Sequence, residues 1–496
     1  MLCRGVQAHG AGTASFAKVR ATPDQASPRE QILAHDAFLD FRTAVLPVNA
    51  PARRPCVRLV DALSASPALG WSMLYFFFLL TGYMVLRPVR DAMGASDDVS
   101  AVFPMALIGW AQTRGFALQD FTLQVLFTAT FVAMVALQPL YGALVSRFPR
   151  RVFLPAVYVL FIACLAGFYW AFHEQTSGRG ALFFVWIAVF NLFAVSVFWS
   201  YMADVFDDED ARKVYGYIGA AGTVGAFTGP LITRSLVGMV GVGNLLIVSA
   251  GFLVLCVICI LRLRPWALSK EATRGELSGD TAMGGSILAG LRLVWERPLL
   301  RALAMLMFFG VGVGTLLYNE QAAIARLSFH DDAARARYYA NIDLAVNTLT
   351  ILVQLLMTRW LMRRFGIGPL LLLPACAILL GFSLLTASPL PLFVAIVQVV
   401  TRASEFSLSK PARETIYTRV DPETRYKGKA VIDTVIYRGG DLSFVWLHKL
   451  LAAFGSKAVF GAGIVIAAAM AIGAWRVYRE QARLPGGAPA ARGGAD

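Results

Sequence analysis

The chain has 496 residues, of which 57% are hydrophobic and only 15% are charged, and its formal net charge is +14. A soluble domain carries about 25% charged residues. This composition, with a mean hydropathy of +0.61, therefore excludes an ordinary soluble protein and indicates a protein built for lipid. An excess of positive charge in a membrane protein collects on cytoplasmic loops, which explains the basic balance more simply than binding to nucleic acid.

Residues 1–66 are rich in Ala, Arg, Pro and Asp and lack the apolar stretch of about 7–15 residues that a signal peptide needs. We expect them to form a poorly ordered cytoplasmic extension. Two sets of six apolar segments follow, each close to the length of about 20 residues that crosses a bilayer. The first set comprises residues 68–90, 121–145, 152–173, 181–203, 215–238 and 243–262. The second set comprises residues 298–322, 340–361, 367–386, 390–409, 429–453 and 457–477.

These segments predict an all-α membrane protein with twelve transmembrane helices in two bundles. We expect the bundles to span residues 67–262 and 298–478, with a basic cytoplasmic linker over 263–297 and a disordered cytoplasmic tail over 479–496.

The first span ends in the charged stretch "YMVLRPVRDAMG", residues 83–94. Arg87 and Arg90 are three residues apart and lie on one helical face, and Pro88 between them is expected to kink the helix. An arginine at bilayer depth costs roughly 2.5 kcal/mol or more unless it faces a bundle interior or a wet cavity. The two arginines either snorkel to the interface beside Asp91 or bind an anion in a cavity. We favour the cavity, because positive charge is disfavoured at the periplasmic end, where this span should finish.

Loop charges and an internal repeat organise the rest of the chain. The turns after spans two and eight read "SRFPRR" and "TRWLMRRFG", whereas turns on the other side carry few positive charges, so both termini should be cytoplasmic. Residues 141–155 correspond to 357–371, and 204–216 to 418–429, both at an offset of about 215 residues. Two parallel six-helix halves joined by a long charged loop resemble the layout of a major facilitator superfamily transporter.

The seventh span ends in "LLYNEQ", which places Glu320 after roughly 20 apolar residues. The carboxylate is either an interfacial group at the helix end, a site for a proton or counter-cation, or a gate partner for an arginine. Because the seventh span repeats the first, Arg90 and Glu320 are candidates to face each other across the cavity.

Spans eight and ten also carry polar residues. Asp343, Asn347 and Gln354 line one face of span eight, where we favour contacts with neighbouring helices over contact with a solute. Arg402 and Glu405, three residues apart in span ten, are most simply an internal ion pair.

Span eleven contains the stretch "YKGKAVIDTVIYRGGDLSF". Asp433 follows Lys429 by four residues, a spacing at which the two side chains can pair, and Lys427 lies just before them. Arg438 and Asp441 lie about 14 and 18 Å further along the helix than Lys429. At that depth Arg438 either binds an anion or forms a structural ion pair with Asp441.

Four segments resemble the ATP/ADP translocase (NTP/NDP exchange transporter) family. They are "VLRPVRDAMG", "FWSYMADVFDDEDARKVYGYIGAAGTVGAFTGP", "LLYNEQAAIARL" and "SKPARETIYTRVDPETRYKGKAVIDTVIYRGG". The likeness runs from about residue 68 to 480. It implies that the family's first-span cation corresponds to Arg90, its seventh-span carboxylate to Glu320, and its span-eleven lysines to Lys427 and Lys429. The family's acidic residue inside span four has no counterpart here before Asp204, where the chain offers only Asn191 and Ser196.

No pattern indicates an enzyme, a cofactor or a metal. The glycine-rich stretch 216–230 lacks the GK[ST] of a P-loop and follows no strand, so it is interpreted as a close helix-packing surface. Cys256 and Cys259 lie in an apolar span without a second pair. The five histidines fall mostly in tails and loops.

We therefore expect a monomeric, multi-pass transporter of the bacterial inner membrane that carries an anionic solute, with nucleotide exchange implied by the resemblance. The expected substrate-binding residues are Arg87, Arg90, Glu320, Lys427, Lys429, Asp433 and Arg438. Two alternatives stay open. One is a permease for a non-nucleotide organic anion, proton-coupled through Glu320, and the other is a transport-inactive membrane scaffold or sensor.

Overall fold

The structure is a computed structural model that describes residues 66–147, 150–206, 208–274, 287–417, 420–421 and 428–483. The predictions for the N-terminal extension up to residue 65, for residues 275–286 of the linker, for the tail beyond residue 483 and for Lys427 lie outside these ranges.

The N-terminal half begins with α3, which starts at a proline in the first helical turn and carries the predicted arginines near its end. Its elements are α3 (Pro67–Gly94), α4 (Val99–Val102), α5 (Met105–Thr113), η1 (Leu118–Phe121), α6 (Thr122–Arg147), α7 (Arg150–His173), α8 (Arg179–Val205) and α9 (Asp208–Arg274). The helix α9 is interrupted at Gly241, whose φ of 78° is not helical, so it comprises two consecutive helices.

The C-terminal half contains three short π-helical turns, η2, η3 and η5, inside its long helices. Its first elements are α10 (Ile287–Glu296), α11 (Pro298–Ser328), α12 (Asp332–Val353), η2 (Gln354–Thr358), α13 (Arg359–Phe365) and α14 (Gly368–Ala387). They are followed by α15 (Pro391–Ser404), η3 (Glu405–Ser409), α16 (Lys410–Tyr417), α17 (Lys429–Val431), η5 (Ile432–Ile436), α18 (Tyr437–Ala452) and α19 (Ser456–Gln481).

Ten helices of the described residues are long and apolar enough to cross a membrane. One of them, Val214–Ser269, has 56 residues and contains the break at Gly241, so it accounts for two crossings. The helix formed by α17, η5 and α18 is not among the ten, because charged residues such as Arg438 and Asp441 interrupt its apolar sequence. The all-α membrane class is thus confirmed, and the count of twelve transmembrane helices stays a prediction.

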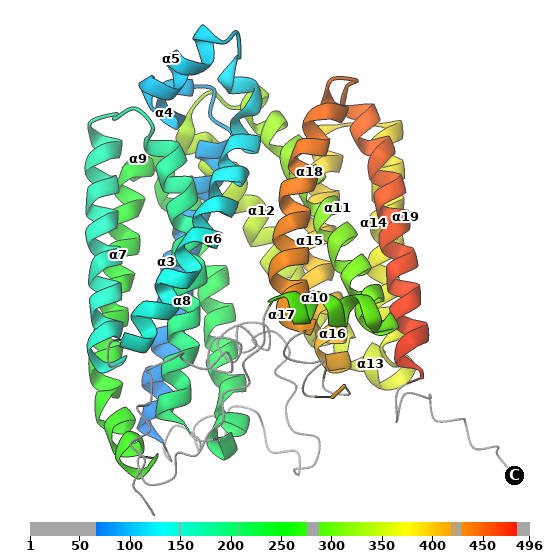
Figure 1. Cartoon of the computed structure of the whole chain (residues 1–496). Helices are drawn as coiled ribbons and strands as arrows, with labels where there is room; N and C mark the ends of the chain where they lie inside the picture. The colour runs from blue at the N-terminus through cyan, green and yellow to red at the C-terminus, as the bar shows by residue number, and fades with distance from the viewer. Residues whose placement is uncertain are drawn as a thin grey trace, which may run out of the picture.

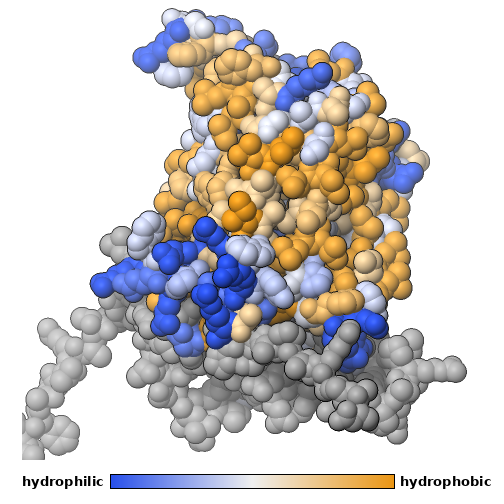
Figure 2. Space-filling view, turned by 90° about the vertical axis from the view of Figure 1, so that its right-hand side faces the viewer, coloured by the Kyte–Doolittle hydropathy of each residue, from blue (hydrophilic) through white to orange (hydrophobic). Residues whose placement is uncertain are grey.

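Figure 1 shows the two halves side by side, with α3 to α9 on one side, most of α10 to α19 on the other, and α12 between them. Each half has its own apolar core, and the first core extends to Ala322, Ala336 and Val445 of the C-terminal half. On the face shown in Figure 2, apolar side chains form a broad band with hydrophilic side chains above and below it. This distribution is the one expected of a surface in contact with lipid.

The glycine-rich stretch packs α9 against α3. A Cβ on Gly225 would lie 2.5 Å from the Phe77 carbonyl oxygen, and one on Gly229 would lie 2.5 Å from the Met84 Cβ. The backbones approach so closely that only glycine fits, which confirms the interpretation of residues 216–230 as a packing surface.

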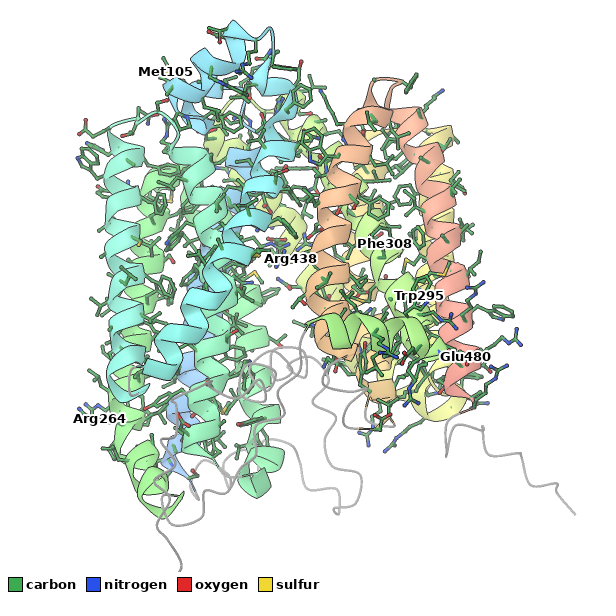
Figure 3. The ribbon with its side chains drawn as sticks, in the orientation of Figure 1. Met105, Arg264, Trp295, Phe308, Arg438 and Glu480 are labelled. Atoms are coloured by element: carbon green, nitrogen blue, oxygen red, sulfur yellow. The ribbon has the colours of Figure 1, made fainter. Side chains whose placement is uncertain are left out.

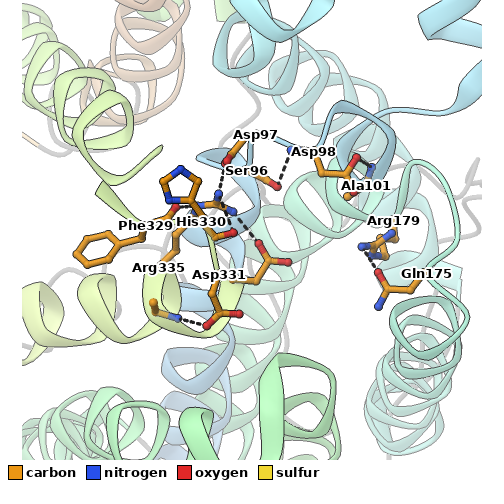
Figure 4. A network of polar contacts seen from close by, with 12 residues as sticks. Ser96, Asp97, Asp98, Ala101, Gln175, Arg179, Phe329, His330, Asp331 and Arg335 are labelled. Carbon is orange, nitrogen blue, oxygen red and sulfur yellow. Dashed lines mark hydrogen bonds and ion pairs between the residues drawn. The ribbon is translucent and has the colours of Figure 1, made fainter. Parts of the chain in front are cut away.

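Polar contacts join the halves at the end where α4 and α5 lie (Figure 4). Arg335 at the start of α12 forms an ion pair with Asp97, which follows α3 in the other half. The same guanidinium donates to Asp332 at 2.8 Å and to the Phe329 carbonyl at 2.8 Å, and its side chain is only 2% exposed. Nearby, Asp98 caps α4, and the hydrogen bonds it accepts from the Ser100 hydroxyl and from backbone N–H groups lower the pKa of its carboxyl.

Asp97→Asn should make this end of the protein open more often. The amide loses the charge attraction that joins the halves, while Asp332 still holds Arg335, so the fold should remain intact. An ion pair of this kind is worth up to about 1 kcal/mol, which corresponds to about a fivefold shift in the closed-to-open equilibrium. The measurement is the rate at which a membrane-impermeant thiol reagent labels Ser96→Cys, a buried position, in a background without native cysteines.

Asp331→Asn is the matched control for that change. This substitution removes the same charge from the residue next to Asp332. The Asp331 side chain accepts a hydrogen bond from the Ala334 N–H at the start of α12 and does not form the ion pair with Arg335. An equal rise in labelling in both variants, or none in Asp97→Asn, would show that the ion pair does not hold the halves together.

Candidate functional site

A buried carboxylate on α12 lies between arginines of the two halves. Asp343 contacts Arg402 of α15 at 2.7 Å and Arg87 of α3 at 3.8 Å. Its side chain is 2% exposed, and those of Arg402 and Arg87 are 17% and 20% exposed. The contacts are close but poorly directed, because neither Asp343 oxygen nor Arg87 Nε makes a well-formed hydrogen bond to a described residue. Two guanidinium groups thus share one carboxylate, and Arg87 Nε is a donor without a hydrogen-bond partner among the described residues.

The second predicted arginine, Arg90, is held by its neighbour. Its Nε and Nη2 donate to one oxygen of Asp91 at 2.9 and 2.6 Å, and its guanidinium lies 5.1 Å from the centre of the Phe184 ring. The Tyr318 hydroxyl of α11 donates to the same Asp91 oxygen at 3.0 Å, which joins this group to the C-terminal half. The local pairing with Asp91 is thus confirmed, and α11 adds a partner that the sequence did not reveal.

Glu320 does not face Arg90, so that expectation was wrong. The Glu320 carboxylate lies 2.9 Å from His448 Nε2 on α18, and both side chains are buried. The reason is helical geometry: Tyr318 and Glu320 are two residues apart and point to nearly opposite faces of α11. Tyr318 therefore faces α3, and Glu320 faces α18.

Span eleven presents a second contact to α11 and an exposed cation. The Thr315 hydroxyl donates to Asp441 at 3.1 Å, two turns along α18 from His448. Arg438 is paired with Asp441 at 3.5 Å, yet its side chain is 39% exposed, about twice the exposed fraction of Arg87, Arg90 or Arg402. In Figure 3 Arg438 lies between the two halves. The ion pair with Asp441, one of the two alternatives for Arg438, is thus present, and anion binding by Arg438 stays a prediction.

A second charged cluster joins span ten to span eleven. Lys429 Nζ lies 2.7 Å from Glu414, and Arg413 Nη2 lies 2.6 Å from Glu405. Glu405 therefore pairs with Arg413 and not, as expected, with Arg402, so that prediction was wrong. Lys429 pairs with Glu414, and its predicted pairing with Asp433 stays a prediction. One Asp433 oxygen is buried without a hydrogen-bond partner among the described residues.

The π-helical turns explain the changed partners in span ten. Glu405 opens η3, and a π turn contains one more residue than an α turn, so the eight residues from Glu405 to Arg413 make about two turns. Arg402 precedes η3 and faces α12 instead.

The π turns of spans eight and ten also bind each other. Gln354 of η2 donates to the Phe406 carbonyl at 3.2 Å, and Thr358 donates to the Ser407 carbonyl at 2.8 Å. Asn347 donates to the Ala226 carbonyl of α9 at 2.8 Å. Asp343, Asn347 and Gln354 thus all contact neighbouring helices, as predicted, and Asp343 does so through ion pairs.

Span four supplies an amide where the family resemblance implies an acid. Asn191 in α8 has a buried side-chain oxygen without a hydrogen-bond partner among the described residues. Within the described ranges, no cluster of three or more His, Cys, Asp or Glu residues has the arrangement of a metal site, and Cys256 and Cys259 are buried free thiols.

Two family models match this chain. A sequence model of the Major Facilitator Superfamily matches residues 97–400, and a model described as TLC ATP/ADP transporter matches residues 336–481. No curated protein matches the chain.

Two solved structures show the same fold. A D-xylose–proton symporter is similar with a TM-score of 0.53 and 16% identity, over 80% of this chain and 96% of that one. The nucleoside transporter NupG, in a single-residue variant, is similar with a TM-score of 0.53 and 13% identity, over 83% of this chain and 99% of that one. The chain therefore belongs to the Major Facilitator Superfamily of membrane transporters, and its C-terminal half is similar to the TLC ATP/ADP transporters.

Proposed function

We propose that this protein is a secondary transporter that carries an anionic solute across the bacterial inner membrane by alternating access, and that nucleotides such as ATP and ADP are its substrate class. The observation that carries the proposal is the sharing of Asp343 by Arg87 of one half and Arg402 of the other. An anion that binds both arginines would contact both halves at once, which alternating access requires of a solute.

The charge balance of the central groups supports an anionic solute. Four guanidinium groups, on Arg87, Arg90, Arg402 and Arg438, are paired with three carboxylates, on Asp91, Asp343 and Asp441. The four arginines thus exceed the three carboxylates by one positive charge. The Nε of Arg87, which has no hydrogen-bond partner among the described residues, is a further donor for an anion. Guanidinium groups bind phosphate through a planar fork of N–H donors and keep their charge at any relevant pH.

The match of residues 336–481 to the TLC ATP/ADP transporters supports nucleotides among the anions. Arg402, Lys429, Asp433 and Arg438 lie inside the matched part. In this proposal the phosphates bind the central arginines, and ATP is cargo and not fuel. Without a bound anion, Arg87 and Arg402 have only the Asp343 carboxylate between them, and their repulsion would slow the reorientation of the empty carrier. A carrier that reorients only when loaded exchanges one anion for another.

The proposed orientation places both termini and the linker in the cytoplasm. Arg359, Arg363 and Arg364 of α13 lie at the end of span eight that is remote from α4 and α5. Positive charge favours the cytoplasmic side, so the end held by Asp97 and Arg335 would face the periplasm.

The test is uptake of radiolabelled ATP into proteoliposomes that contain the purified protein. Vesicles preloaded with ADP should take up ATP at least tenfold faster than empty vesicles, because exchange returns the loaded carrier across the membrane. No uptake, together with no change in melting temperature on addition of ATP or ADP, would exclude the nucleotide proposal.

A proton-coupled permease for a different organic anion is the second candidate. The buried Glu320–His448 pair favours it, because two neighbouring titratable groups inside a bundle can hold a proton. The absence of an acidic residue in span four before Asp204 points the same way. Uptake driven by an imposed pH gradient into vesicles without internal nucleotide would support this candidate over exchange.

A further inference from the structure

A groove runs along the outer seam where α9 of the N-terminal half packs against α12 of the C-terminal half. It has a volume of about 510 Å³ and is lined by Arg234 of α9 and by Asn341, Leu344, Ala345, Thr348, Leu349 and Leu352 of α12. These α12 residues recur at intervals of three and four, so they form one face of the helix. Asp343 and Asn347 lie on the buried face of α12, so the groove is separate from the central charged groups.

Polarity changes along the groove in one direction. Arg234 and Asn341 lie at its polar end, and Leu349 and Leu352 lie at its apolar end. The α12 wall from Asn341 to Leu352 is about 16 Å long, close to half of the roughly 30 Å hydrocarbon core of a bilayer. The acyl chains of a phospholipid in one leaflet cover about the same depth. A phospholipid also has its charge at one end and its apolar surface at the other, as the groove does.

A second arginine extends the polar end. Arg337 lies one helical turn from Asn341 and is exposed, with its guanidinium against Gly238 of α9, where a Cβ would collide with it. Gly238 is in turn four residues from Arg234, on the same face of α9. Neither Arg234 nor Arg337 forms an ion pair with a described residue, although both lie on the helices that face lipid.

We infer that this groove is a binding site for an anionic phospholipid, with the headgroup phosphate between Arg234 and Arg337 and one acyl chain along Leu344, Leu349 and Leu352. Charge complementarity selects an anionic headgroup, because two arginines near a membrane surface attract acidic lipids. The apolar wall selects a lipid over a soluble anion. Since one arginine comes from each half, the bound lipid bridges the seam along which the halves must move.

The test uses photoactivatable phosphatidylglycerol with a diazirine in its acyl chain, added to the purified full-length protein. Crosslinks are mapped by mass spectrometry, and the proposal predicts them on residues 341–352 of α12. Unlabelled phosphatidylglycerol should compete, whereas phosphatidylcholine with the same acyl chains should compete about tenfold less well. Arg234→Gln combined with Arg337→Gln should lower the crosslink yield in the groove by about tenfold.

Two further variants keep the result interpretable. Arg359→Gln with Arg363→Gln removes the same charge from the other end of span eight and should leave crosslinking in the groove unchanged. Thr348→Trp fills the acyl part while both arginines remain, and it should also lower the yield. Unchanged melting temperatures establish that the variants are folded.

Three outcomes would overturn the proposal. Equal competition by phosphatidylcholine would mean an ordinary lipid contact, and competition by inorganic phosphate would mean a site for a soluble anion. Equal loss of crosslinks in the Arg359/Arg363 variant would mean a general effect of surface charge. The result does not depend on the transported substrate, because lipid binding is measured without transport.

Discussion

Asp343→Asn is expected to destabilise this protein by about 3–5 kcal/mol and to abolish transport. Asp343 is the only described carboxylate within ion-pair distance of Arg87 and Arg402, and its removal leaves two largely buried guanidinium groups without that counter-charge. The loss of one partner from a buried ion pair is costly because the remaining charge cannot be hydrated. The measurement is the unfolding free energy in detergent by denaturant titration, together with uptake in proteoliposomes.

The double variant Asp343→Asn/Arg402→Gln distinguishes this mechanism from a simple packing defect. It removes one positive and one negative charge and leaves Arg87 with amide partners, so most of the lost stability should return. Transport should stay absent, because one of the two arginines proposed to bind the anion is missing. If the double variant is as unstable as Asp343→Asn, the unpaired charge is not the cause.

Arg90→Ala should lower the initial rate of ATP uptake by at least about thirtyfold, while the amount of folded protein stays the same. Truncation of one charged partner at a buried polar contact costs about 2–5 kcal/mol, and every 1.4 kcal/mol is a factor of ten. The fold should tolerate the change better than Asp343→Asn, because Asp91 still accepts the hydrogen bond of Tyr318 and still interacts with the positive charge of Arg87. Uptake is compared at equal amounts of reconstituted protein.

Arg262→Ala is a suitable control for the loss of an arginine. Its guanidinium also lies over an aromatic ring, 5.6 Å from the centre of Trp71, but the residue is exposed and far from the central groups in the chain. Normal transport is expected. If Arg90→Ala also transports normally, Arg90 serves only Asp91, and the anion binds elsewhere.

The membrane class, the division into halves and most helix positions could be predicted from the sequence. Apolar length is a local property, and a run of about 20 such residues has no stable alternative to a membrane helix. The span predicted at 68–90 corresponds to α3 at Pro67–Gly94, and that at 457–477 to α19 at Ser456–Gln481. The pair of arginines near the end of the first span was likewise visible, because charge inside an apolar run is rare.

The sequence did not reveal which charged residues contact each other. Arg402 was assigned to a pair with Glu405, although the structure joins Arg402 to Asp343. His448 was placed among the uninformative histidines, although it lies two turns from Asp441 on a buried face of α18. The spacing of seven residues between Asp441 and His448, which places both on one helical face, was the signal in the sequence that His448 is buried.

The sequence thus specified which segments cross the membrane and which of them carry charge, because hydrophobicity and helical period act within one segment. The tertiary structure decided which charges meet, since that depends on the rotation and the vertical register of each helix. The π turn at Glu405 shows the reason most clearly: one additional residue in a turn rotates everything after it by about a quarter of a turn, and so directs Glu405 to Arg413 and leaves Arg402 for Asp343.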